Sequence, residues 1–161
     1  MSLYNRRYVL FTPLALMACG FAPAYGPGGA AAALQGRIRV ADPSDKRGFD
    51  LVERLEERLG RPEAARFDLA YSIVTDVANL GITPEDAITR YHLTGHIDWT
   101  LTSRETGQRV TGGRVQSFTA YSATGSSVAG LTAEQDAAYR LMRILADQIV
   151  TRLIASAGSW A

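Results

Sequence analysis

Few side chains in this sequence stand at spacings that could support chemistry. The two histidines, His92 and His96, lie four residues apart in "RYHLTGHIDW". On a helix that spacing would permit metal chelation, but the alternation of polar and apolar residues around them predicts a strand. Four residues of strand span about 13 Å, which is too far for two ligands of one zinc ion. We therefore predict no metal site and two solvated histidines.

Candidates for a nucleophile or an acid–base pair are equally sparse. The stretch "GSSVA" at 125–129 approaches the G-x-S-x-G elbow of serine hydrolases, but Ala129 replaces the last glycine. The carboxylates near strands and turns are scattered and predict no acid–base pair: Asp68, Asp76, Asp98 and Glu105. These residues therefore predict no catalytic motif, and no cofactor is expected. A hydrolase using Ser126 or Ser127 remains an alternative.

Cys19, the only cysteine, indicates a different chemistry. Residues 1–18 contain Arg6 and Arg7 and then an apolar stretch of 11 residues. A membrane-spanning helix needs about 20, so this stretch is typical of a secretory signal. The sequence "LMAC" at 16–19 resembles a bacterial lipobox, which implies acylation of Cys19 and cleavage before it. Two or more acyl chains would anchor the protein stably.

The residues around the predicted cleavage site also indicate a location. Gly20 stands where the signal for inner-membrane retention typically has aspartate, so we expect the outer membrane, on its periplasmic side. Residues 19–35 are rich in Gly, Ala and Pro and predict a flexible tether after the lipidated cysteine. Without residues 1–18, 15 basic residues face 16 acidic ones. This balance predicts no nucleic-acid partner.

Periodicity predicts one α+β domain over residues 36–157. The expected elements are a short strand in "GRIRVAD", a helix over 46–59, strands in "RFDLAYSIVTDV", "TRYHLTGHIDWTLTS" and "VTGGRVQSFTAYS", and a helix over 132–156. The order β-α-β-β-β-α predicts a two-layer sandwich, in which two helices cover one face of a four-stranded, mostly antiparallel sheet.

Local signals add detail to these elements. Ser44 or Asp45 is expected to cap the first helix, and Thr132 opens a T-x-x-Q capping box for the second. Gly107 is the expected positive-φ residue of the hairpin turn. Gly112 and Gly113, in the strand that follows, predict either a bulge or a close approach of another backbone.

The third strand predicts one apolar and one polar face of the sheet. Tyr91 and Trp99 fall on the apolar face and are expected in the core. The polar face displays Arg90 and His92, with Arg114 on the next strand. These groups could bind phosphates or sugars, or another protein could cover them.

Three stretches together resemble the lipopolysaccharide (LPS) assembly lipoprotein family, LptE, in its alphaproteobacterial form. They are "ACGFAPAYG", "ITRYHLTGHIDWTLTSRETGQRV" and "VQSFTAYSATGSSVAGLTAEQDAAYRLMRILADQIVTRL". The resemblance implies a non-enzymatic plug in the lumen of the LPS-translocating β-barrel LptD, with LPS as a further partner. Arg90, His92 and Arg114 are then candidate contacts to barrel or LPS. A periplasmic lipoprotein adaptor of another envelope machine is the alternative.

Overall fold

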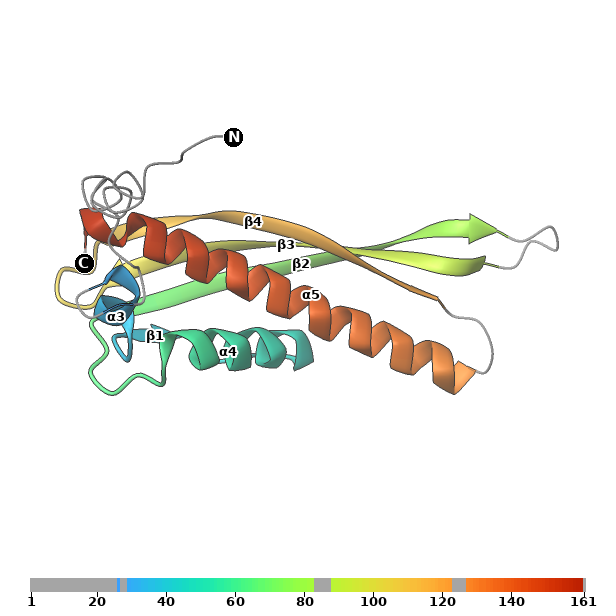
Figure 1. The fold of residues 1–161 in the computed structure, drawn as a ribbon, viewed down its shortest axis with the longest axis horizontal. Coiled ribbons are helices and arrows are strands. Elements are labelled where there is room, and N and C mark those ends of the chain that lie inside the picture. The colour runs from blue at the N-terminus through green and yellow to red at the C-terminus, as the bar shows by residue number, and fades with distance from the viewer. Residues whose placement is uncertain (1–25, 27–28, 83–87, 123–126, 161) are drawn as a thin grey trace, which may run out of the picture.

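The computed structural model describes residue 26 and residues 29–82, 88–122 and 127–160 (Figure 1). The predicted signal peptide and Cys19 lie outside these residues. The elements in chain order are α3 (Ala30–Leu34), β1 (Ile38–Val40), α4 (Lys46–Leu59), β2 (Phe67–Ile82), β3 (Ile88–Ser103), β4 (Arg109–Ser122), α5 (Ser127–Ser156) and the 3-10 turn η1 (Ala157–Ser159).

The four strands form one sheet in the order β1-β2-β3-β4. β1 pairs parallel to β2, and the other two pairings are antiparallel. Helices α4 and α5 lie on the same side of this sheet (Figure 1). The predicted two-layer α+β fold, with two helices on one face of a mostly antiparallel sheet, is therefore confirmed.

The core lies between the sheet and the two long helices. Side chains spaced along α5 at helical intervals are fully buried: Leu141, Leu145, Ile149 and Leu153. They meet every second residue of β3, including Leu93, Ile97, Trp99 and Leu101. The predicted core position of Trp99 is confirmed, and Tyr91 stacks on Tyr121 at the same face with ring centroids 5.1 Å apart. This packing joins the helices to the sheet.

Helix α4 has the ends that its sequence predicts. The Asp45 carboxylate accepts a hydrogen bond of 2.7 Å from the Gly48 backbone N–H, which satisfies one of the free donors at the start of the helix. Gly60, with φ of 76°, ends the helix in a conformation that favours glycine. The guanidinium of Arg54 donates two bonds of 3.0 Å to Asp147 and so links α4 to α5.

Two glycines of the β3–β4 hairpin also behave as predicted. Gly107 has φ of 68° in the turn. A side chain added at Gly112 would place its Cβ 2.6 Å from the Trp99 carbonyl oxygen, so the close backbone approach is the correct one of the two alternatives. The shift in strand register falls between Leu101 and Thr102, not opposite Gly112.

Three boundaries differ from the sequence-based expectation. The tether expected over 19–35 ends in helix α3, whose Leu34 is fully buried in the core. Helix α5 begins at Ser127, and Thr132 donates a hydrogen bond of 3.0 Å to the Val128 carbonyl inside it. The capping-box prediction was therefore wrong, because a serine five residues earlier already begins the helix. β2 continues to Ile82 through two register shifts after Asn79.

Candidate functional site

The face of the sheet turned away from α4 and α5 is the candidate site, and we call it the open face. Its side chains come from every second position of three strands, since successive strand residues point to opposite sides. They are Asp68, Ala70, Ser72, Val74, Asp76 and Ala78 of β2, the even-numbered residues 90–102 of β3, and Arg114, Gln116, Phe118, Ala120 and Ser122 of β4. Most are polar, as predicted.

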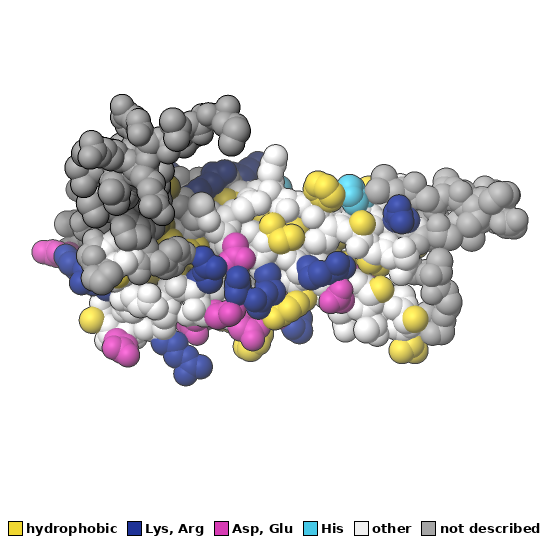
Figure 2. All heavy atoms as spheres, in the orientation of Figure 1, with side chains coloured by type: hydrophobic (Ala, Val, Ile, Leu, Met, Phe, Trp, Pro, Cys, Tyr) yellow, Lys and Arg dark blue, Asp and Glu magenta, His cyan; other side chains and the backbone are white. Residues whose placement is uncertain are grey.

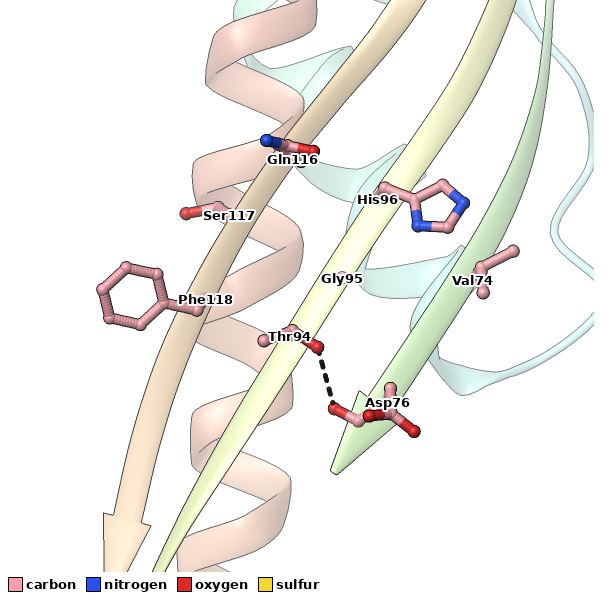
Figure 3. A pocket seen from close by; sticks show the side chains of 8 residues that line it. All are labelled: Val74, Asp76, Thr94, Gly95, His96, Gln116, Ser117 and Phe118. Atoms are coloured by element: carbon pink, nitrogen blue, oxygen red, sulfur yellow. Dashed lines mark hydrogen bonds between the residues drawn. The ribbon is translucent and has the colours of Figure 1, made fainter. Parts of the chain in front are cut away.

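The centre of the open face is a shallow hollow of about 630 Å³. Figure 3 shows its lining, with the His96 ring extending from β3 over the side of β2 and Phe118 at the outer side of β4. Val74 and Phe118 are 49% and 60% exposed. Thr94 donates a hydrogen bond of 3.3 Å from its hydroxyl to the Asp76 carbonyl. The hollow therefore offers apolar contact together with hydrogen-bonding groups.

Arg114 is held by Asp98 on the neighbouring strand. The guanidinium donates two hydrogen bonds, of 2.8 and 2.7 Å, to the two carboxylate oxygens. These bonds lower the pKa of Asp98 and raise the pKa of Arg114, because each partner stabilises the charged form of the other. Arg114 therefore presents an ion pair to the open face instead of a separate cation.

The structure separates the three site residues predicted from sequence. His92 and Arg90 are neighbours on β3, and the His92 ring lies 4.6 Å from the Phe118 ring. Arg90 is paired with Ser122 near the far end of the hairpin, whereas Arg114 is opposite Asp98. The eight strand residues between these positions correspond to about 27 Å. Arg90 and Arg114 thus belong to two different places on one face.

Sequence reasoning missed the exposed Phe118. The side chains of β4 alternate regularly between the two faces, but the apolar Phe118 points to the open face and the polar Thr119 points towards α5. The pattern of hydrophobicity is therefore the reverse of what burial would predict at these two positions. The hydroxyl of Thr119 donates a hydrogen bond of 3.0 Å to the Ala137 carbonyl, which satisfies its burial. Counting in steps of two from the buried Val115 would have placed Phe118 on the open face.

The other chemical candidates are not brought together. The residues that the structure describes contain no cluster of three or more histidine, cysteine or acidic side chains that could hold a metal ion. Ser127 is exposed at the first turn of α5, and Ser126 lies outside the described residues. Within the described part of the chain, no helix combines the length and apolar character needed to cross a membrane.

Several solved structures with the same fold are described as lipoproteins. A candidate lipoprotein from Caulobacter crescentus CB15 has 23% identity and a TM-score of 0.68, covering 83% of this chain and 99% of its own. The rare lipoprotein B from Shewanella oneidensis has 13% identity and a TM-score of 0.57, covering 74% and 93%. A minor lipoprotein from Acinetobacter baumannii has 13% identity and a TM-score of 0.55, covering 74% and 90%. At these identities the likeness shows a shared fold.

Comparison at the level of sequence gives a more specific result. Among curated proteins, none matches this chain. The family model for lipopolysaccharide assembly, LptE, matches residues 36–153, which include the strands of the sheet and almost all of α5. The predicted resemblance is confirmed, and the chain belongs to the LptE family of lipopolysaccharide-assembly proteins.

Proposed function

We propose that this protein is an outer-membrane lipoprotein, anchored through acylated Cys19, that plugs and helps assemble the LPS-translocating β-barrel LptD. In this role it supports insertion of LPS into the outer leaflet. Family membership already assigns the chain to LPS assembly, without enzymatic activity. The lipid anchor at Cys19, the LptD partner and the position inside its lumen are proposed here in addition.

The polar open face is the observation that best supports a position inside the barrel. The lumen of a transmembrane β-barrel is polar, so a protein inside it needs a hydrophilic exterior and a core of its own. Here α5 and α4 cover the apolar face of the sheet, and the open face keeps its hydrogen-bonding side chains available. β2, with 16 residues at about 3.3 Å each, is about 50 Å long, compared with an apolar barrel band of about 25 Å.

We further propose that Arg90, His92 and Arg114 contact the barrel wall or LPS. Arg90 is exposed and forms no ion pair with the described residues, so its guanidinium is available to a phosphate or a carboxylate. His92 and Phe118 beside it add a paired aromatic surface. Arg114 offers its ion pair with Asp98, which suits a polar wall that supplies both donors and acceptors.

Copurification with LptD under mild detergent tests the proposal. The double variant Arg90→Glu/Arg114→Glu should retain less barrel or bind less LPS, because both exposed positions then carry the opposite charge. Arg47→Glu/Arg140→Glu makes the same charge change on helices α4 and α5, which cover the opposite face of the sheet, and is the matched control. Unchanged barrel recovery and unchanged LPS binding in the first variant would remove the proposed contacts.

The same preparation tests the anchor and the alternative function. Cys19→Ser should leave the membrane fraction after a high-salt wash, which screens charge-based lipid binding but does not release an acyl anchor, and barrel recovery should fall with it. A Cys19→Ser form that stays in the salt-washed membrane with no barrel beside it would overturn the proposal. Recovery of a different envelope machine by the wild-type protein would favour the adaptor.

A further inference from the structure

One end of the molecule carries a group of arginines that form no ion pair with other described residues. α3, β1, the β3–β4 turn and the last turns of α5 meet at this end, at the left of Figure 1. We call its four exposed arginines the base arginines: Arg37, Arg61, Arg66 and Arg109. They come from three separate segments of the chain, before β1, between α4 and β2, and at the start of β4, so the fold alone brings them together.

Backbone contacts fix the base arginines close to one another. The Arg66 N–H donates to the Arg37 carbonyl at 2.8 Å, and the Arg104 N–H donates to the Arg66 carbonyl at 2.9 Å. The Arg61 carbonyl lies 3.5 Å from the Cβ position at Gly36, next to Arg37. Arg109 begins β4 opposite Thr102, two residues before Arg104. These contacts link the segments before β1, before β2 and after β3 at one end of the sheet, where β4 also begins.

The charges at the base differ from those on the helices. Over α4 and α5, basic and acidic side chains alternate and pair, as Arg54 does with Asp147 and Arg140 with Asp136 (Figure 2). Within the described residues, none of the base arginines forms an ion pair. The nearby Asp68 is already engaged by Arg104 at 3.4 Å. The acidic residues Glu63 and Glu105 are outnumbered, so the base has an excess of positive charge.

We infer that the base arginines bind the anionic headgroups of phospholipids in the membrane to which the chain is anchored. This inference rests on the proposed anchoring through Cys19 for its setting. Ten residues separate Cys19 from Ala30, and a fully extended chain of that length reaches about 37 Å. The base, where α3 begins, is therefore the end of an about 50 Å body that the anchor keeps near the lipid surface.

Arginine chemistry fits this partner. A guanidinium can donate two parallel hydrogen bonds to a phosphate, and it stays charged at any physiological pH. Each basic side chain near an anionic membrane surface strengthens binding by about fivefold. Three base arginines would therefore contribute about 100-fold, which would hold the base at the lipid surface.

Vesicle binding by the Cys19→Ser chain tests the inference without any acyl group. Sedimentation is measured with phosphatidylcholine vesicles and with vesicles that also contain phosphatidylglycerol, and the quantity compared is the gain due to the anionic lipid. Residues 1–18 are the same in every variant, so their contribution cancels. In the variant Arg37→Gln/Arg66→Gln/Arg109→Gln, this increase in vesicle affinity should be about 100-fold smaller than in the parent.

The control Arg47→Gln/Arg140→Gln/Arg143→Gln removes the same charge on helices α4 and α5, away from the base and from the open face, and should keep the gain within about fivefold of the parent. Unaltered cooperative thermal unfolding shows that the variants are folded. Absence of a gain in the parent, or equal losses in the two triple variants, would overturn the inference. Barrel copurification separates the two proposals. If the lipidated base variant still recovers the barrel although it has lost vesicle binding, the two functions are independent and the plug proposal stands. If the parent binds anionic vesicles but never recovers a barrel, the plug proposal fails and the base inference stands.

Discussion

On β3, Ile97 is fully buried in the core while the adjacent Asp98 is exposed on the open face. The same contrast continues along the strand, where Leu93 and Leu101 are buried and Thr94 is exposed. One face of the sheet therefore supplies hydrophobic stabilisation, and the other contributes little to the core. Substitutions on the open face should therefore lower the free energy of unfolding much less than substitutions on the covered face, which leaves the open-face side chains available for binding.

The largest effect should come from the covered face. Ile97→Ala should lower the free energy of unfolding by about 2–5 kcal/mol, because it removes buried methyl groups and leaves a cavity beneath the helices. Phe118→Ala, which removes a larger but 60% exposed side chain, should change stability by no more than about 0.5 kcal/mol. Urea denaturation measures both. Equal losses would show that the open face is also a packed surface.

A middle-sized effect should come from a polar group on the covered face. Thr119→Val keeps the shape of the side chain but removes the hydroxyl that donates to the Ala137 carbonyl, so it should cost about 1 kcal/mol. Thr94→Val removes an exposed hydroxyl at the open face, where water replaces its bond to Asp76, and should be close to neutral. A greater loss for Thr94→Val in thermal unfolding would reverse the proposed contrast.

The smallest effect should come from the open-face ion pair. Arg114 lowers the pKa of Asp98 in the folded protein, so the stabilisation is present above the unfolded pKa, about 3.9, and is lost as the pH falls through the lowered folded pKa. Asp98→Asn should therefore be slightly less stable at neutral pH and should converge with the wild type in acid.

Denaturation at a series of pH values measures this dependence. Asp76→Asn is the control, because Asp76 is an open-face carboxylate without an ion pair among the described residues. If the difference in unfolding free energy between Asp98→Asn and the wild type did not depend on pH, the ionised pair would not be the source of that difference.

Much of the fold could be predicted because its signals are local. Alternation along residues 91–101 separated the two faces of β3, and Asp45 and Gly60 marked the ends of α4. The start of α5 could not be found in this way, since both Ser127 and Thr132 can begin a helix. The short helix α3 was also missed, because its alanines and Leu34 are held by burial against distant residues.

The candidate site was predicted only in part. Arg90, His92 and Arg114 were correctly placed on one polar face, but their separation and the pairing of Arg114 with Asp98 depend on strand register. Phe118 was missed because its outward position reverses the pattern of hydrophobicity in β4. Register is set by the turn and by packing across strands, and neither is visible in one strand alone.

The order of the strands and the two long helices, the two-faced sheet and the family resemblance could all be predicted from the sequence, because periodicity and motif order are local properties of the chain. Which charges form ion pairs could be found only from the folded structure. Arg114 meets Asp98 across two strands, whereas the base arginines come from three segments and form no ion pair with the residues that the structure describes. Such proximity depends on how the chain folds back on itself, since ion pairing is governed by distance in space.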